Sequence, residues 1–278
     1  MGHKLYEGMP RTPRFKRVVA LLGESAGGGG AVGVTAGGIE EIADATLAAS
    51  EGGLQRAKVD EGLAYCVYLM AQITQAARKE DFVSALSDAG VSAPRETPVT
   101  GARYTVYDLI GSFTAAVDRH LQQSRSRNDI SELAQLAASE SLTALCRSRA
   151  ETLFGSSQAS VQESLRVLST KKGFSTLTHD FFARLTRRYL EYHLSRELSN
   201  HVGAERRFAN AGQYNKFLKQ LDTYCRVATG PMRDFAGEWY SKHNFQRDLS
   251  LQKSRGFTAH AIDKVRGAMR YQERRDAD

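Results

Sequence analysis

The stretch STLTHDFFARLTRRYLEYHLSRELSNHV, residues 175–202, carries the best-defined helical pattern in the sequence. Its apolar residues recur every four positions in two rows, Leu177, Phe181, Leu185 and Tyr189, then Leu190, Leu194, Leu198 and Val202. Because residues three and four apart share one face of a helix, the pattern predicts a helix with a broad apolar surface. About 27 residues rising 1.5 Å each span about 40 Å, enough to cross a domain. We expect an all-α fold, an irregular multi-helix bundle around this central helix.

The other periodic runs are also helical and are joined by short loops, which favours a bundle. We expect a basic arm and a glycine-rich linker over 1–38 and a helical domain over 39–278. The proline-containing loop 91–101 is a candidate sub-boundary, and 204–278 is distinguished by basic and aromatic residues. Within the domain we expect one helix over 54–79, and a short helix over 232–240 followed by a loop over 241–252.

Composition limits the class of protein. Hydrophobic residues make up 41% and charged residues 25% of the chain, which is ordinary for a globular protein. Cys66, Cys146 and Cys225 are odd in number and far apart, which argues against a disulfide framework and a zinc site and fits a reducing cytoplasm. No run approaches the roughly 18 apolar residues of a membrane span. We expect a cytoplasmic protein with no membrane partner.

Charge is distributed unevenly along the chain, whose formal net charge is +7. Residues 1–22 hold five basic and one acidic side chain, and residues 205–278 hold fifteen basic and nine acidic ones. The segment between them is mildly acidic. The pattern indicates either anionic partners or basic ends that dock on an acidic body.

The glycine-rich tract over 23–38 contains a formal G-x-G-x-x-G match at Gly28, Gly30 and Gly33. A dinucleotide site needs this turn inside a strand–helix–strand unit, and no such pattern follows. A phosphate-binding Walker loop would need Gly-Lys-Ser/Thr, which the tract lacks. We interpret the tract as a linker or a close-packed turn and expect no cofactor.

No arrangement of residues predicts a catalytic or metal site. His179 and His193 are 14 residues apart, about 21 Å along a helix, which is too far for one metal ion. Cys225 and His243 are a nucleophile and a base that the sequence alone cannot place together. No G-x-S-x-G elbow is present. We assign no catalytic residue and no metal ligand, and we favour a non-enzymatic protein.

Two groups of residues are candidate interaction sites. An extended basic arm could lie on an acidic protein or on phosphates and order only when bound; its residues are Gly2, Arg11, Arg14, Phe15, Lys16 and Arg17. In the last third, basic and aromatic side chains are mixed as in proteins that neutralise phosphates and stack on bases; these residues are Arg206, Arg207, Lys216, Lys219, Trp239, Lys242 and Arg247. The stretch 239–247 also fits a packed corner of the core, or a contact with a partner protein.

The layout of the chain resembles the B component of Qat anti-phage defence systems. A Met-Gly start, a short basic arm, the glycine tract Gly27–Gly38 and a helical body carry the resemblance. It implies partnership with a QueC-like nucleotide-modifying enzyme that acts on the freed N-terminal glycine, here Gly2. The longer Pro- and Gly-rich leader of that family is missing, and the stretch 239–247 has no counterpart in it. The leading hypothesis is an adaptor or subunit of a bacterial multi-protein system that binds proteins of its own gene cluster; the alternative is a nucleic-acid-binding protein.

Overall fold

The computed structural model describes residues 13–23, 36–92, 105–150, 157–203 and 206–275. These ranges are almost entirely helical and contain no β-strand, which confirms the predicted all-α class. The helices are α1 (Pro13–Gly23), α2 (Ala36–Ala49), α3 (Glu51–Ala57), α4 (Glu61–Ala76), α5 (Phe82–Asp88), α6 (Val106–Ser124), α7 (Asp129–Ala150), α8 (Gln158–Leu168), α9 (Lys171–Leu198), the 3-10 turn η1 (Ser199–His201), α10 (Ala211–Ala228), α11 (Met232–Gln246) and α12 (Leu251–Arg275).

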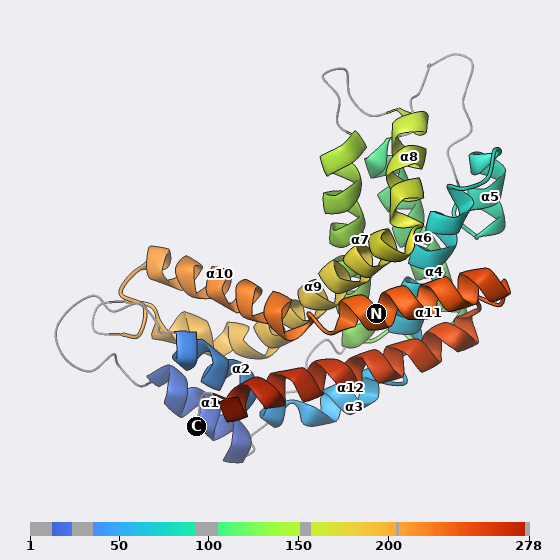
Figure 1. Ribbon diagram of the computed structural model, residues 1–278. Coiled ribbons are helices and arrows are strands. Elements are labelled where there is room, and N and C mark those ends of the chain that lie inside the picture. The colour runs from blue at the N-terminus through green and yellow to red at the C-terminus, as the bar shows by residue number, and fades with distance from the viewer. Residues whose placement is uncertain (1–12, 24–35, 93–104, 151–156, 204–205, 276–278) are drawn as a thin grey trace.

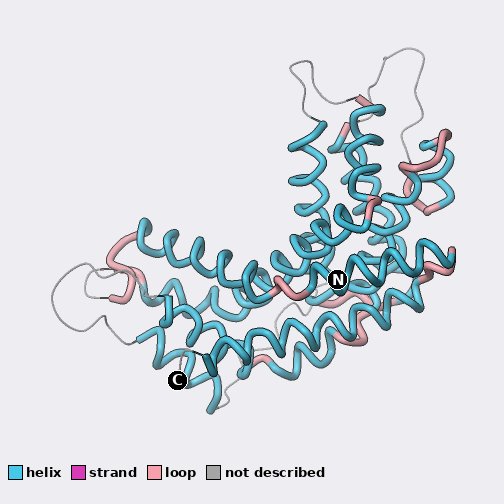
Figure 2. Tube along the Cα trace, viewed as in Figure 1, coloured by secondary structure: helices cyan, strands magenta, loops and turns pink. Residues whose placement is uncertain are grey.

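Helix α9 is the predicted central helix, and it begins four residues earlier than expected. The Thr170 hydroxyl accepts a hydrogen bond from the Gly173 N–H at 3.0 Å and caps the first turn. Helices α2, α7, α8, α10 and α11 all pack against α9. Figures 1 and 2 show α6, α7 and α8 standing together on one side of it, while α10 and α11 leave it in opposite directions.

The side chains of α9 are buried around much of its circumference. Phe174, Phe181, Phe182, Leu190 and Leu194 are fully enclosed, although they do not share a single face. A helix that is apolar on several sides has to be surrounded by other elements. The central position of α9 therefore follows from its sequence.

The polar residues of α9 form a continuous chain of alternating charges with residues of α7 and α10. We call this chain the charge ladder, and in order along it the members are Arg188, Glu140, Arg184, Asp180, Arg226, Asp222, Arg187 and Glu191. Asp180 is 8% exposed and accepts from Arg184 Nε at 2.6 Å and Arg226 Nη1 at 2.8 Å. Burial opposes ionisation of Asp180, but the hydrogen bonds from these two arginines outweigh it and lower its pKa.

The expectation for residues 13–17 is wrong, because they are helical rather than extended. Pro13 occupies the first position of α1, where its missing N–H costs no hydrogen bond. Phe15, Val18 and Leu22 of α1 are buried against the rest of the molecule, chiefly against α2. The helical domain therefore includes residues that we expected to form part of the arm.

Two other boundaries differ from expectation. The helix expected over 54–79 is two helices, because the Asp60 carboxylate accepts from the Leu63 N–H at 2.7 Å and starts α4 anew. Residues 241–246, expected in a loop, continue α11, which ends at Gln246 and is followed by Arg247 with φ of 54°.

Helices α9 and α11 approach each other closely at Gly237. A Cβ atom at this position would lie 2.3 Å from Ser175 Oγ and 3.3 Å from the Lys171 carbonyl oxygen. The Ser175 hydroxyl donates to the Arg233 carbonyl at 2.7 Å, so it cannot move aside without losing that bond. The absence of a side chain at Gly237 thus sets the spacing of the two helices.

We expect Gly237→Ala to lower the free energy of unfolding by about 1–3 kcal/mol, because the methyl group overpacks the contact. Gly256→Ala on α12 is the matched control. Its Cβ meets no atom within 4 Å, and alanine favours a helix by up to about 1 kcal/mol over glycine. Urea unfolding followed by circular dichroism measures both variants. Equal effects of the two substitutions would contradict the close contact.

We expect Asp180→Asn to lower the free energy of unfolding at pH 7 by about 2 kcal/mol, because two arginines lose a charged acceptor. A lowered carboxyl pKa contributes stability above the unfolded value, here 3.8, and that stability is lost as the pH falls through the folded pKa. The difference between wild type and variant should therefore shrink from pH 5 to pH 3 in urea titrations. Asp234→Asn, on the exposed face of α11, is the control and should change stability by less than about 0.5 kcal/mol.

Candidate anion-binding surface

The exposed side of α1 is basic. Arg14 and Arg17 each have 64% of the side chain exposed, and Lys16 is exposed beside them. Arg14 Nη1 lies 3.1 Å from Glu51 Oε2, and Arg17 Nη2 lies 3.8 Å from Glu41 Oε1. Ion pairs this open to solvent contribute at most about 1 kcal/mol each, so an anionic partner can compete for both arginines.

Phe15 does not belong to this exposed side. It is 6% exposed and packs in the core, so the hypothesis that it contacts a partner needs correction. The apolar spacing Phe15, Val18, Leu22 is helical, and it carries the signal that could have placed α1 in the bundle. The many basic residues and the two prolines of this segment favoured the prediction of an extended arm instead.

The turn between η1 and α10 contacts the end of α1. The Arg207 guanidinium donates to the Leu21 carbonyl of α1, and the Arg206 guanidinium donates to the Asn200 carbonyl. Phe208 is 1% exposed and anchors the turn in the core, and Gly203 supplies a φ of 141°. Arg207 is therefore held against α1, and Arg206 is held against η1.

Helix α10 adds two lysines to the same end of the molecule. Lys216 and Lys219 are exposed, and Phe217, Leu221 and Tyr224 on the opposite side are buried. Tyr224 donates to Asp44 Oδ1 of α2 at 2.9 Å, and burial together with the Asp44 charge raises the pKa of this phenol. The bond fixes α10 beside α2, on which α1 also packs.

The structure thus brings together basic residues from both ends of the sequence. We call this group the basic end. Its members are Arg14, Lys16, Arg17, Arg206, Arg207, Lys216 and Lys219. In Figure 1, α1 and the N-terminal half of α10, which carries Lys216 and Lys219, lie at the same end of the molecule. The grouping needs tertiary structure, because about 190 residues separate Arg17 from Arg206.

The remaining members of the predicted nucleic-acid set lie elsewhere. Trp239, Lys242 and Arg247 belong to α11 or its C-terminal cap, which point away from α10 (Figure 1). At 1.5 Å per residue, about 20 Å of helix separates Lys216 from the α10–α11 turn, and about 16 Å separates that turn from Lys242. The seven residues therefore do not form one continuous surface.

Trp239 takes part in an aromatic cluster within the fold. Its ring centroid lies 4.5 Å from Phe257, 5.4 Å from His243 and 6.2 Å from Phe174. Aromatic pairs at these distances stabilise a core beyond their buried area. Residues 239–247 were open to three interpretations, and the packed corner of the core fits the position of Trp239. Lys242 and Arg247 of the same stretch are exposed.

Several predicted features lie outside the described residues. They include Gly2 and Arg11 of the arm, residues 24–35 of the glycine tract and residues 93–101 of the candidate sub-boundary. Gly37 and Gly38, which we assigned to the linker, belong to α2.

The residues considered for catalysis are buried and contribute to the packing of the fold. Cys225 is fully buried, and burial raises the pKa of its thiol, which disfavours the nucleophilic thiolate. His243 is 7% exposed, and its Nδ1 lies 2.6 Å from Asp248 Oδ1. Among the described residues, no group of three or more His, Cys, Asp or Glu side chains is arranged to hold a metal ion.

None of the helices in the described ranges is both long and apolar enough to cross a membrane. The chain matches no protein-family model, no curated protein and no solved structure.

Proposed function

We propose that the chain is a non-enzymatic helical adaptor that binds an acidic partner protein through the basic end. The carrying observation is that α1, the turn over 206–208 and α10 place seven basic side chains at one end of a packed helical body. Positive charge gathered in this way steers an anionic partner and favours its encounter with that end.

A protein partner is favoured over single-stranded nucleic acid by what surrounds the basic end. Sequence-tolerant binding of single strands relies on aromatic side chains that stack on bases. The tryptophan expected to serve this purpose is half-buried, packs against Phe257, and lies on the far side of the α10–α11 turn. Arg206 and Arg207 each donate to a backbone carbonyl, so part of their hydrogen-bonding capacity is already used.

The resemblance to the Qat B component supports a more specific version of the same proposal. In that version the chain is a subunit of a bacterial anti-phage defence system, and Gly2 is presented to a QueC-like enzyme. Helix α1 would anchor the segment that carries Gly2, since it packs on α2 while its basic side stays exposed.

We expect Lys216→Glu/Lys219→Glu to reduce partner capture from the native host at least tenfold, because the double substitution reverses the charge of α10 within the basic end. Lys242→Glu/Arg247→Glu is the control with the same change in net charge, on α11, and should leave capture unchanged. Tagged proteins, checked for folding by circular dichroism, are used as bait, and the partners are quantified by mass spectrometry. Equal losses with both pairs would refute a site at the basic end.

A second measurement separates the protein partner from nucleic acid. Purified protein is titrated with single- and double-stranded DNA and RNA at 50 and 200 mM salt. Phosphate contacts make affinity fall steeply over this range. The proposal expects no binding that depends on Lys216 and Lys219; nucleic-acid binding lost in the α10 variant and kept in the α11 variant would replace the acidic protein by nucleic acid.

A further inference from the structure

The two exposed arginines of α1 are paired with carboxylates of the same chain, but the two pairs differ. Arg14 Nη1 donates to Glu51 Oε2 at 3.1 Å and to the Ala48 carbonyl, near the end of α2, at 3.2 Å. Arg17 Nη2 lies 3.8 Å from Glu41 Oε1, which is too long for a hydrogen bond. Arg14 is therefore held in place, whereas the contact of Arg17 with Glu41 is a loose ion pair.

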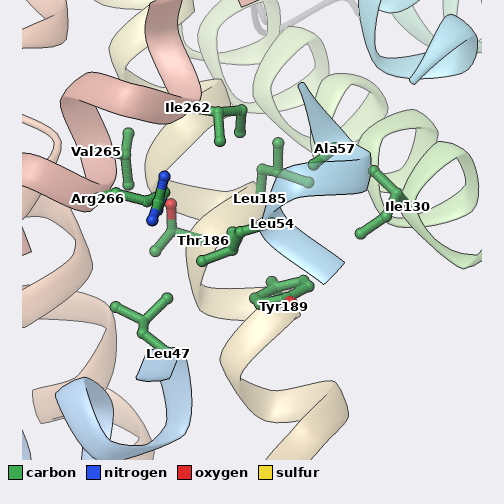
Figure 3. Close-up of a pocket in the computed structure, with 10 residues that line it drawn as sticks. All are labelled: Leu47, Leu54, Ala57, Ile130, Leu185, Thr186, Tyr189, Ile262, Val265 and Arg266. Carbon is green, nitrogen blue, oxygen red and sulfur yellow. The ribbon is translucent and has the colours of Figure 1, made fainter. Parts of the chain in front are cut away.

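The carboxylate that pairs with Arg14 is tied to the interior. Glu51 accepts from Arg14 through Oε2 and from Arg266 of α12 through its other oxygen, Oε1. Arg266 lines an apolar pocket between α2, α3, α7, α9 and α12, and Figure 3 shows it beside Thr186. The enclosed part of this pocket has room for little more than one water molecule, so the pocket belongs to the core. Glu51 is thus unsuited to exchange its partners.

Glu41 has the opposite properties. It lies on α2, its side chain is 55% exposed, and an ion pair this open to solvent is broken at little cost. Helix α1 keeps its position without the pair, because Phe15, Val18 and Leu22 are buried and apolar burial outweighs an exposed ion pair. A carboxylate of a partner can approach Arg17 to hydrogen-bonding distance and bind two of its N–H groups at once. That contact is stronger than the present one at 3.8 Å, so it can replace Glu41.

We propose that Glu41 is an internal competitor of the basic end, which occupies Arg17 in the free protein and gives it up to a carboxylate of the bound partner. The inference rests on the proposed function, because it assigns a regulating residue to the site that binds the acidic partner. Any acidic partner that uses Arg17 has to displace Glu41 first. Glu41 therefore lowers the affinity of the basic end, and its removal raises that affinity.

The probe for this competition is octaglutamate, a peptide of eight glutamates, and its affinity for the full chain is measured by isothermal titration calorimetry at 50 mM salt. Glu41→Gln should raise the affinity about two- to fivefold, which is the range that exposed ion pairs contribute. Glu238→Gln is the matched control. Glu238 lies on α11, is also exposed, and forms an ion pair of the same length, 3.8 Å, with Lys171 Nζ. The control changes the net charge equally and should alter the affinity by less than twofold.

A double-mutant cycle separates displacement of Glu41 from simple repulsion between Glu41 and the peptide. Arg17→Gln removes the group for which Glu41 and the peptide compete, so adding Glu41→Gln to this variant should leave the affinity unchanged. Circular dichroism verifies that each variant is folded. The proposal is overturned if Glu41→Gln does not raise the affinity, if Glu238→Gln raises it equally, or if the rise persists in the Arg17→Gln background.

The same titration tests the proposed function separately. The Lys216→Glu/Lys219→Glu variant keeps Arg17 and Glu41 and should bind octaglutamate at least tenfold more weakly than the wild type. No binding to the wild type, or equal binding to both proteins, would overturn the proposed site for acidic partners. A tenfold loss in this variant, together with unchanged affinity in Glu41→Gln, would overturn the inference about Glu41 alone.

Discussion

The fold depends on one constraint, which is that α9 presents large apolar side chains in several directions and must be enclosed. Phe174, Phe181 and Phe182 are all buried, so no single neighbour can cover them. Helices α7, α8, α10 and α11 supply the enclosure. The charged positions of α9 are tolerated because the charge ladder satisfies them with residues of α7 and α10. Apolar burial thus determines that α9 is surrounded, and paired charges fix the position of two of the surrounding helices.

The sequence predicted this central helix because its apolar residues repeat over seven turns with no proline inside. It did not predict the ends of shorter helices, since these depend on single hydrogen bonds such as that of Asp60 with the Leu63 N–H. Helix α1 was missed because its few apolar residues are interspersed with arginine and lysine, whose long side chains are compatible with either an arm or a solvent-exposed helix face. Helix α11 was underestimated because residues 241–246 are mostly polar and gain helical structure next to the packed Trp239 and His243.

The candidate interaction site shows a different limit of sequence reasoning. Each basic cluster was visible in the sequence, yet the joining of Arg17 to Arg206 and the separation of Lys219 from Lys242 are tertiary facts. The mixture of basic and aromatic residues assigned all seven C-terminal residues to one site, whereas the direction in which α11 leaves α10 divides them. The pocket gave no sequence signal, because its lining comes from five helices and each contributes ordinary core residues.

Glu51 has a consequence for the order in which the protein is assembled. It forms ion pairs with Arg14 in the first described helix and with Arg266 in the last, so one carboxylate links distant parts of the chain. During synthesis α1 and α2 emerge together and can pair while still on the ribosome. The ion pair with Arg266 can form only after residue 266 has been translated. A nascent chain therefore carries α3 without this second contact until α12 has been synthesised.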